Sequence, residues 1–158
     1  MADAPEWARA LGRVPSGLFI VTAGTADDAT GFLASWVQQV GLEPASLSVA
    51  IKQGRHVGRL IRDHGTFCVS ILDSESKDLL GHFARGFAPG DPAFVGIDTA
   101  TTDCGVPFLT GALAHLVCRF VDAVDWADHS IVCGEVVGGR PHREGDPIVH
   151  LRKHGQTY

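Results

Sequence analysis

The sequence lacks the marks of a secreted or membrane protein. No apolar run approaches the roughly 20 residues that a membrane-spanning helix needs. The first residues carry no basic segment followed by an apolar one, so we expect no secretory signal peptide and a cytoplasmic protein. Positive charge is also scarce, because 13 Lys and Arg stand against 18 Asp and Glu, a net charge of −5. This balance argues against a nucleic-acid coat and against binding to anionic membranes.

Cysteine is scarce as well. The four cysteines, Cys68, Cys104, Cys118 and Cys133, form no CxxC pair and lie in apolar segments. We therefore expect buried, reduced thiols, as is usual in the cytosol. A disulfide between Cys118 and Cys133 is the alternative, because the two are symmetric about a polar loop and would face each other across a hairpin.

Motifs for self-sufficient catalysis are absent from the sequence. No two glycines stand two positions apart, which excludes GxGxxG, and neither a Walker loop, a GxSxG elbow nor HExxH occurs. His150 and His154 are four residues apart, but no third ligand lies nearby, so we predict no metal site. No pair of catalytic carboxylates stands out. If the protein is an enzyme, we expect a cofactor to carry the reaction.

Glycine, by contrast, is abundant. The chain has 158 residues, enough for one compact domain spanning 1–158, and 19 of them are glycine. Such use of glycine indicates tight corners in a β-rich chain, or backbone that approaches a ligand closely.

Short apolar segments separated by turn residues predict a mainly β fold. We expect strands at 18–23, 31–37, 47–51, 66–72, 111–122, 130–137 and 148–152. Helices are inserted between the third and fourth strands and after the fourth, which does not follow a βαβ alternation. A small closed β-barrel with a few appended helices fits this order.

The clearest helix is predicted at 55–64. Its apolar residues Val57, Leu60 and Ile61 have helical spacing, and Gly65 ends it. A short helix is expected near the start of the chain, and another one is expected to begin at Asp73 or Ser74. Residues 85–107 lack periodicity and are expected to form a long loop, a feature that is often functional.

Several motifs in order resemble those of one known family. The segments are 12–22 (GRVPSGLFIVT), 31–40 (GFLASWVQQV), 42–44 (LEP), 82–85 (HFAR) and 128–132 (DHSIV). Together they resemble the flavin reductase-like family, whose fold is the FMN-binding split β-barrel of Greek-key type. Within it, segments 85–90 and 150–153 are most similar to the reductase-like domain that ends cyanobacterial flavodiiron proteins.

The resemblance implies a function and partners. Members of the family are typically homodimers that bind FMN or FAD and accept hydride from NADH or NADPH. They often supply reduced flavin to a partner monooxygenase or another electron acceptor protein. The expected function is therefore that of an NAD(P)H:flavin oxidoreductase with FMN, or FAD, as cofactor. Two alternatives stay open: a non-catalytic electron-transfer flavoprotein that carries FMN, and a barrel for another ligand such as haem or for assembly alone.

The resemblance also implies site residues. Those along the flavin ring and ribityl chain are Ala34, Ser35, Trp36 and Gln39. Those of the phosphate-binding turn are Ile51, Lys52, Gln53, Arg55, His56 and Val57. Those of a second flavin segment are His82, Phe83, Ala84 and Arg85. His129, which follows Asp128, is the candidate catalytic residue near the flavin and the nicotinamide.

The phosphate-binding turn also has physical support. Gly54 lets the backbone bend toward a ligand, and the helix N-terminus that follows presents free N–H groups to an anion. Lys52 and Arg55 add positive charge. The alternative is an ordinary surface helix with Arg55, Arg59 and Arg62 on its exposed side.

Some residues depart from the family pattern or have a simpler explanation. The hydroxyl residue usual in the phosphate turn is replaced by Gly54-Arg55-His56, so charge would hold the phosphate. Ala127 stands where the family has glycine before Asp128-His129. Trp36 and Phe83 also fit as core residues, and His129 also fits an ordinary hairpin loop.

Overall fold

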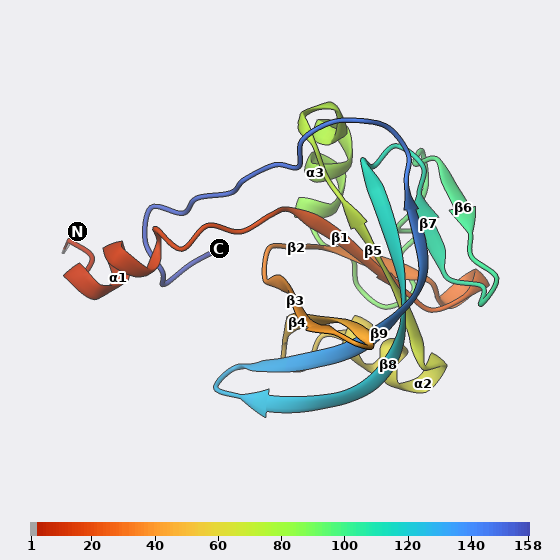
Figure 1. The fold of residues 1–158 in the computed structure, drawn as a ribbon, viewed down its shortest axis with the longest axis horizontal. Helices are drawn as coiled ribbons and strands as arrows, with labels where there is room; N and C mark the ends of the chain where they lie inside the picture. Colours follow the sequence, from red (N-terminus) through yellow and green to blue (C-terminus); the bar gives the residue numbers. More distant parts are fainter. Residues whose placement is uncertain (1–2) are drawn as a thin grey trace.

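The computed structural model describes residues 3–158, which form a curled β-sheet with helices at its ends (Figure 1). Along the chain the elements are α1 (Glu6–Leu11), β1 (Phe19–Ala23), η1 (Ala26–Asp28), β2 (Thr30–Ala34), β3 (Val37–Leu42), β4 (Ala45–Lys52), α2 (His56–His64), β5 (Thr66–Ile71), η2 (Ser74–Ser76), α3 (Lys77–Ala84), β6 (Thr99–Thr101), β7 (Pro107–Leu109), β8 (Ala114–Trp126) and β9 (His129–Pro141).

Seven of the strands form one antiparallel sheet in the order β2-β1-β5-β8-β9-β4-β3. The two edge strands, β2 and β3, are consecutive in the chain and are separated only by Ser35 and Trp36. The sheet therefore curls until its two edges adjoin, although β2 and β3 do not pair with each other in the described chain. The predicted mainly β fold is confirmed, with a split in place of full closure.

The inside of the curl is filled by alternate strand residues. Its core holds Val21, Phe32, Val49, Phe67, Val69 and Val132, among others. Helix α2 adds Val57, Leu60 and Ile61, which lie on one side of the helix as its sequence spacing predicts. Gly65 ends α2 in the left-handed conformation, with φ of 72°, and its N–H donates to Ile61.

A second core lies outside the curl, where α3 and the loop after it cover β1 and β2. Phe83 of α3 packs there with Leu18, Ile20 and Leu72. The predicted long loop is not wholly irregular, because it contains β6 and leads into β7, which pair as a small separate sheet. No helix among residues 3–158 is long and apolar enough to cross a membrane.

Two strand predictions need correction. The expected strand at 31–37 is divided into β2 and β3 by the Ser35-Trp36 link. The expected strand at 148–152 is instead an extended arm. It meets the N-terminal segment at a single bridge between Ser16 and His150.

The cysteine predictions are partly wrong. All four thiols are free, and Cys68 and Cys118 are buried, but Cys104 is exposed. Cys118 pairs with Val136 and Cys133 with Asp122, because register shifts bend the long β8–β9 hairpin. The two cysteines therefore do not face each other as the symmetry of the sequence suggested. Burial raises the pKa of the Cys68 and Cys118 thiols to about 12.

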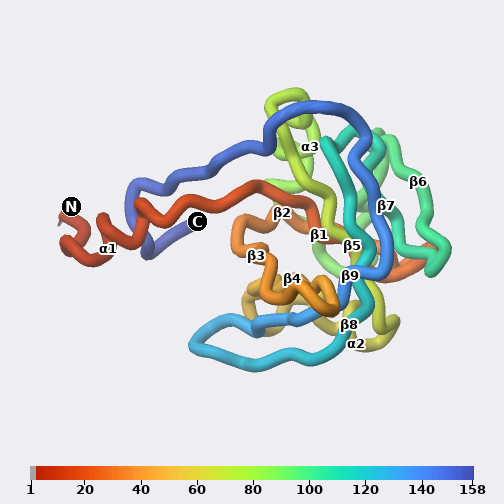
Figure 2. The backbone as a smooth tube through the Cα atoms, viewed as in Figure 1, coloured from red at the N-terminus to blue at the C-terminus, as the bar shows by residue number. Residues whose placement is uncertain are grey.

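The two ends of the chain run side by side away from the sheet, as Figure 2 shows. His150 donates to Ser16, Arg152 to Gly12 and Gly155 to Ala8 through backbone N–H groups. After Gly155 the chain turns back toward the β2–β3 link (Figure 2).

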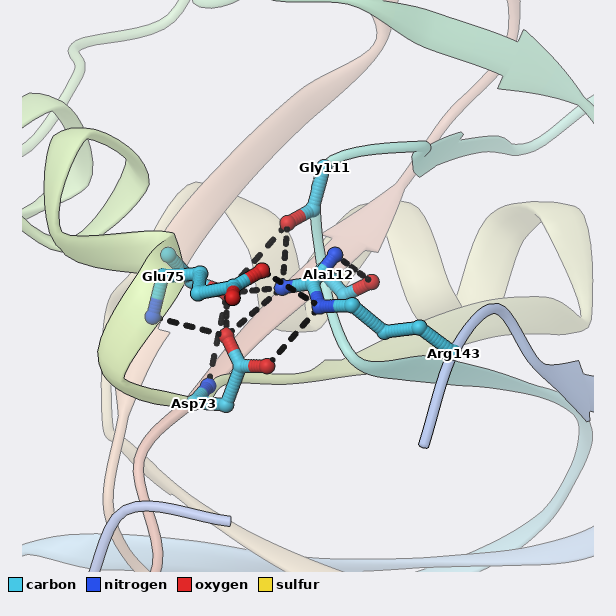
Figure 3. Close-up of polar contacts among 6 residues, drawn as sticks. Asp73, Glu75, Gly111, Ala112 and Arg143 are labelled. Carbon is cyan, nitrogen blue, oxygen red and sulfur yellow. Dashed lines mark hydrogen bonds and ion pairs between the residues drawn. The ribbon is translucent and has the colours of Figure 1, made fainter. Parts of the chain in front are cut away.

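A polar network fixes the base of α3 (Figure 3). The guanidinium of Arg143 binds Asp73, Glu75 and the carbonyls of Gly111 and Ala112. Hydrogen bonds from Arg143 lower the pKa of the buried Asp73 carboxyl. Asp73 also accepts from the N–H of Glu75 and so caps η2. The helix predicted to begin at Asp73 or Ser74 thus starts with this 3₁₀ turn, and α3 follows from Lys77. The chain after β9 is thus joined to the start of α3.

Candidate functional site

The link between β2 and β3 forms one side of a shallow hollow. Its residues Ser35 and Trp36 lie where the chain crosses from one edge of the sheet to the other. The N–H of Ala50 donates to the Trp36 carbonyl at 3.0 Å, which fixes the link against β4. Ala34, Ser35 and Trp36 line this hollow together with Lys52 and Arg55. Trp36 is 37% exposed and is therefore not the core residue that the sequence also allowed.

Three side chains from other parts of the chain surround the Trp36 indole. The His129 ring lies 5.0 Å away and the Tyr158 ring 5.2 Å away, both measured between ring centroids. The Arg152 guanidinium lies over the indole at 5.3 Å, within range of a cation–π interaction. Trp36 thus lies at the centre of a small aromatic cluster that is open to solvent.

The β4–α2 turn supplies the positive charge of the site. Gly54 has φ of 81°, and no atom lies near the position that a Cβ would take. The turn therefore needs glycine for its left-handed backbone conformation, and not because a side chain would clash. Arg55 is the N-cap of α2, but its side chain does not cap the helix. The first N–H groups of a helix have no acceptor within it, so His56 and Val57 leave N–H groups available to an anion.

A groove of about 420 Å³ runs along this helix start. Its walls are the β2 residues Thr30 to Phe32, the α2 residues Arg55 to Val57, and the loop residues Arg85 to Pro89. Arg55 lies over the Phe32 ring at 5.3 Å, and both residues also line the hollow at Trp36. The groove and the hollow therefore adjoin at Arg55 and Phe32. Arg85 lies in the groove, and the aromatic cluster lies at the opposite end, beside the hollow.

His129 lies at the aromatic end and is held from both sides. Its Nδ1 lies 2.7 Å from Asp128 Oδ1, and this hydrogen bond lowers the pKa of Asp128. Its Nε2 is hydrogen-bonded to the Tyr158 hydroxyl. Partial desolvation of its hydroxyl raises the pKa of Tyr158, although most of the side chain is exposed, and the hydroxyl therefore stays protonated and able to donate. An imidazole that donates from Nδ1 to Asp128 has its acceptor lone pair on Nε2, which matches the Tyr158 hydroxyl as donor.

Gln53 organises this end of the site without lining it. Its side-chain amide donates to the carbonyls of Ala127 and His129, both at 3.3 Å. Its backbone N–H donates to Asp128. Gln53 therefore connects the β8–β9 turn, next to His129, with the β4–α2 turn.

The remaining predicted residues lie elsewhere. Gln39 is exposed on β3 and donates to the nearby Gly41 carbonyl. Ile51 is 2% exposed and faces the core, because neighbouring residues of a strand point to opposite faces. Phe83 is 1% exposed and lies in the second core, which agrees with its alternative interpretation as a core residue.

Of the segment 82–85, only Arg85 lines the groove. His82 lies next to the loop carbonyl of Ala93 at 2.7 Å, and Ala84 is exposed on α3. The structure adds residues that were not among the predicted site residues: Phe32, the loop Gly86 to Pro89 and Arg152, which lie in the motif segments, and Tyr158, which lies outside them. The described residues hold no group of three metal-ligating side chains.

The fold and the site define a class: a small split-barrel protein with a positively charged groove and an aromatic hollow where its sheet edges adjoin. Comparison with known proteins gives the family. The flavin reductase-like domain matches residues 11–158, so the chain belongs to that family, as the motifs indicated. The chain is also 37% identical over 152 residues to diflavin flavoprotein A 1 of Synechocystis sp.. That match covers 95% of this chain and 26% of the relative, so the chain spans about a quarter of its length.

Solved structures with the same fold include flavin reductases. The NADH:FAD oxidoreductase SgcE6 of Streptomyces globisporus is 25% identical with a TM-score of 0.83, over 92% of this chain and 86% of that one. BorF, the flavin reductase component of a bacterial two-component tryptophan halogenase, is 26% identical with a TM-score of 0.80, over 94% and 92%. The likeness extends over nearly the whole of these enzymes.

Proposed function

We propose that the chain, acting as one domain over residues 1–158, is an NAD(P)H:flavin oxidoreductase with FMN as its flavin and FAD as a second possibility. The observation that carries this proposal is that the groove at Arg85 adjoins the hollow at Trp36, with Arg55 lining both. A phosphate-binding end thus lies next to an aromatic end, as the two ends of a flavin nucleotide require. Family membership and the flavin reductases of the same fold support it.

The residues of the groove fit a flavin. Arg55, Arg85 and the first N–H groups of α2 suit a phosphate, because each offers a charged or dipolar donor. The Ala34–Trp36 link supplies a surface for the planar ring, and Lys52 lies beside it. When bound, the flavin supplies the acceptor for the hydride of reduced nicotinamide.

His129 is the residue we assign to the nicotinamide. Asp128 holds its Nδ1–H, so its Nε2 is free to accept a hydrogen bond from the nicotinamide carboxamide once Tyr158 has moved. The chain then acts by orientation, because holding the two rings together replaces a collision in solution. No acid or base is needed at the hydride step itself.

A second copy of the chain would complete the site. An apolar cavity of about 750 Å³ opens beside Ser35 and Trp36, and its lining includes Val14, Phe19, Ile131 and Val149. Val14 and Val149 are largely exposed, and contiguous apolar surface of this kind is typical of an interface. We propose a cytoplasmic homodimer in which each flavin lies at the edge of this contact. Reduced flavin or its electrons would pass to a partner oxygenase or another acceptor protein.

One observation favours a second function. The chain matches only about a quarter of the diflavin flavoproteins, which by their name carry two flavins. A domain within such an assembly could hold FMN permanently and pass electrons between protein partners. Tight FMN with slow NAD(P)H oxidation would favour this carrier, whereas ready flavin exchange with rapid turnover would favour the reductase.

The test is equilibrium titration with FMN and FAD, followed by steady-state assays with NADH and NADPH. We expect FMN to bind and to be reduced at the expense of one of the two nucleotides. His129→Asn should raise KM for the nucleotide or lower kcat/KM about tenfold, with flavin affinity unchanged, because one positioning hydrogen bond is lost. Lys153→Ala, which changes an exposed residue of the arm, is the control. A protein that binds neither flavin would refute the proposal.

A further inference from the structure

Residues 156–158 cover the aromatic end of the site. The Tyr158 ring lies against Trp36, and its hydroxyl is hydrogen-bonded to the only His129 nitrogen not engaged by Asp128. The hollow that Tyr158 lines with Ser35, Trp36 and Lys52 measures only about 50 Å³. Tyr158 also lines a larger cavity of about 370 Å³ next to His129 and Arg152. While Tyr158 lies there, it takes the contacts with Trp36 and with His129 Nε2 that a nicotinamide ring in this place would otherwise make.

The arm that carries this segment is firmly anchored up to Gly155. The Gly155 N–H donates to the Ala8 carbonyl of α1 at 2.7 Å. A Cβ at position 155 would lie 2.5 Å from Leu11, so the backbone packs against α1 with no space to spare. A Cβ at Gly12 would likewise lie 2.8 Å from the Arg152 carbonyl. The position of Gly155 is therefore set by α1.

Beyond Gly155 the contacts are few and are made to side chains. Arg152 Nη1 donates to the Thr157 carbonyl at 3.3 Å, and the Gln156 N–H donates to His154 Nδ1 at 3.3 Å. Tyr158 is 65% exposed despite its contacts with Trp36 and His129. Segments with little burial and exposed hydrogen bonds open at low free energy. The three residues can swing out while the arm stays paired with the N-terminal segment.

We propose that residues 156–158 form a lid on the pyridine-nucleotide subsite, with Tyr158 occupying the place of the nicotinamide until NAD(P)H displaces it. This inference rests on the proposed function, because it assumes that the nucleotide binds beside Trp36 and His129. Both partners of Tyr158 are residues that the nucleotide needs. The lid therefore lowers the apparent affinity for the nucleotide by the fraction of molecules in which it is closed. It does not lower the affinity for the flavin phosphate, whose groove it does not line.

The experiment uses NAD⁺ and, in parallel, NADP⁺ as probes, because neither reduces an oxidised flavin. Each is titrated into the FMN-loaded full chain, and the dissociation constant is measured for the wild type and for three variants. Tyr158→Ala removes both lid contacts, Tyr158→Phe keeps the ring and loses the hydroxyl, and Lys153→Ala is the control on the same arm. Nuclear Overhauser contacts between the Tyr158 ring and the Trp36 indole report lid position directly, with and without nucleotide.

We expect Tyr158→Ala to bind the better nucleotide about tenfold more tightly, the change for a lid that leaves about one site in ten open. Tyr158→Phe should gain less, and Lys153→Ala should match the wild type. The Tyr158–Trp36 contacts should vanish at saturating nucleotide. Three results would overturn the lid: unchanged or weaker binding by Tyr158→Ala, no nucleotide binding by any variant, or contacts that persist at saturation. FMN affinity is measured separately, and its absence would refute the proposed function instead.

Discussion

Arg143 holds the Asp73 carboxylate through two parallel hydrogen bonds, from Nη2 to Oδ1 at 2.6 Å and from Nε to Oδ2 at 2.9 Å. Two-point contacts of this kind are stronger than single hydrogen bonds and fix direction as well as distance. The pair connects the chain after β9 with the start of η2 and α3 (Figure 3). Because α3 leads directly to Arg85, this contact supports one wall of the groove.

Arg143→Ala should therefore destabilise the protein markedly. It leaves the Asp73 carboxylate buried without its cation, so we expect the free energy of unfolding to fall by about 2–3 kcal/mol. Urea denaturation measures this change. Arg140→Ala, which removes an exposed arginine three residues earlier, should change the same quantity by less than about 0.5 kcal/mol. Equal changes in the free energy of unfolding would show that the Arg143 network stabilises the fold no more than an exposed arginine does.

The stacked pair His115 and His142 predicts how stability depends on pH. Burial lowers the pKa of both, and each is lowered further by neighbouring positive charge. A histidine whose folded pKa is depressed takes up its proton more readily when unfolded. The free energy of unfolding should therefore decrease as pH falls from 7 to 5, through the ordinary histidine pKa of about 6.5.

Thermal or urea unfolding across this pH range checks the prediction. His142→Gln should flatten the profile for two reasons. One of the two histidines with a lowered pKa is removed, and the pKa of His115 is no longer lowered by the charge of a protonated His142 beside it. His154→Gln, outside the stack, should keep the full dependence. A profile that is flat in the wild type between pH 7 and 5 would contradict this account.

The β8–β9 turn carries a residue in an unfavourable conformation. Ala127 has φ of 53°, in the left-handed region that costs an L-residue about 1–2 kcal/mol. Glycine avoids this cost but loses roughly 0.5–1 kcal/mol of chain entropy. Ala127→Gly should thus raise the free energy of unfolding by about 0.5–1 kcal/mol. Ala29→Gly, at an ordinary φ of −60°, should lower it instead. A loss of stability in both variants would exclude strain at Ala127.

Arg55 and Arg59 offer a matched test of the phosphate end. Both are exposed arginines of the same region, but only Arg55 lines the groove. Arg55→Ala should weaken FMN binding about ten- to hundredfold, the value of a charge-assisted hydrogen bond of roughly 1.5–3 kcal/mol. Arg59→Ala should leave the affinity unchanged. Flavin fluorescence titration measures the FMN affinity of both variants. Equal losses of affinity would show that FMN is attracted by the positive charge of the region and not bound by Arg55 specifically.

Features that depend on local sequence were predictable. Helix α2 was predicted within a residue of its bounds, because Val57, Leu60 and Ile61 share a face and Gly65 supplies the end. Strand alternation, however, means that Ile51 and Lys52 cannot both face a ligand. The family resemblance assigned the whole segment to the site and so included both residues. In the structure only Lys52 lines the site, and Ile51 is buried in the core.

Features made by distant parts of the chain were not predictable. Tyr158 contacts His129, which lies 29 residues earlier in the chain, and Trp36, which lies in the first quarter of it. No local sequence pattern indicates that Tyr158 belongs to the site. The apolar alternation at 148–152 is typical of a strand, yet that segment finds only one bridging partner on the N-terminal arm. The division of 31–37 likewise depends on the curl of the sheet, which places β2 and β3 on opposite edges.

Anaerobic reduction of the bound flavin tests the central claim most directly. The purified chain is loaded with FMN, mixed rapidly with NADH or NADPH without oxygen, and followed by the absorbance of oxidised flavin. We predict rapid loss of that absorbance with one of the nucleotides, saturating with its concentration, and a slower loss in His129→Asn. Tight FMN binding without faster reduction than that of free FMN would contradict the reductase and favour the electron carrier.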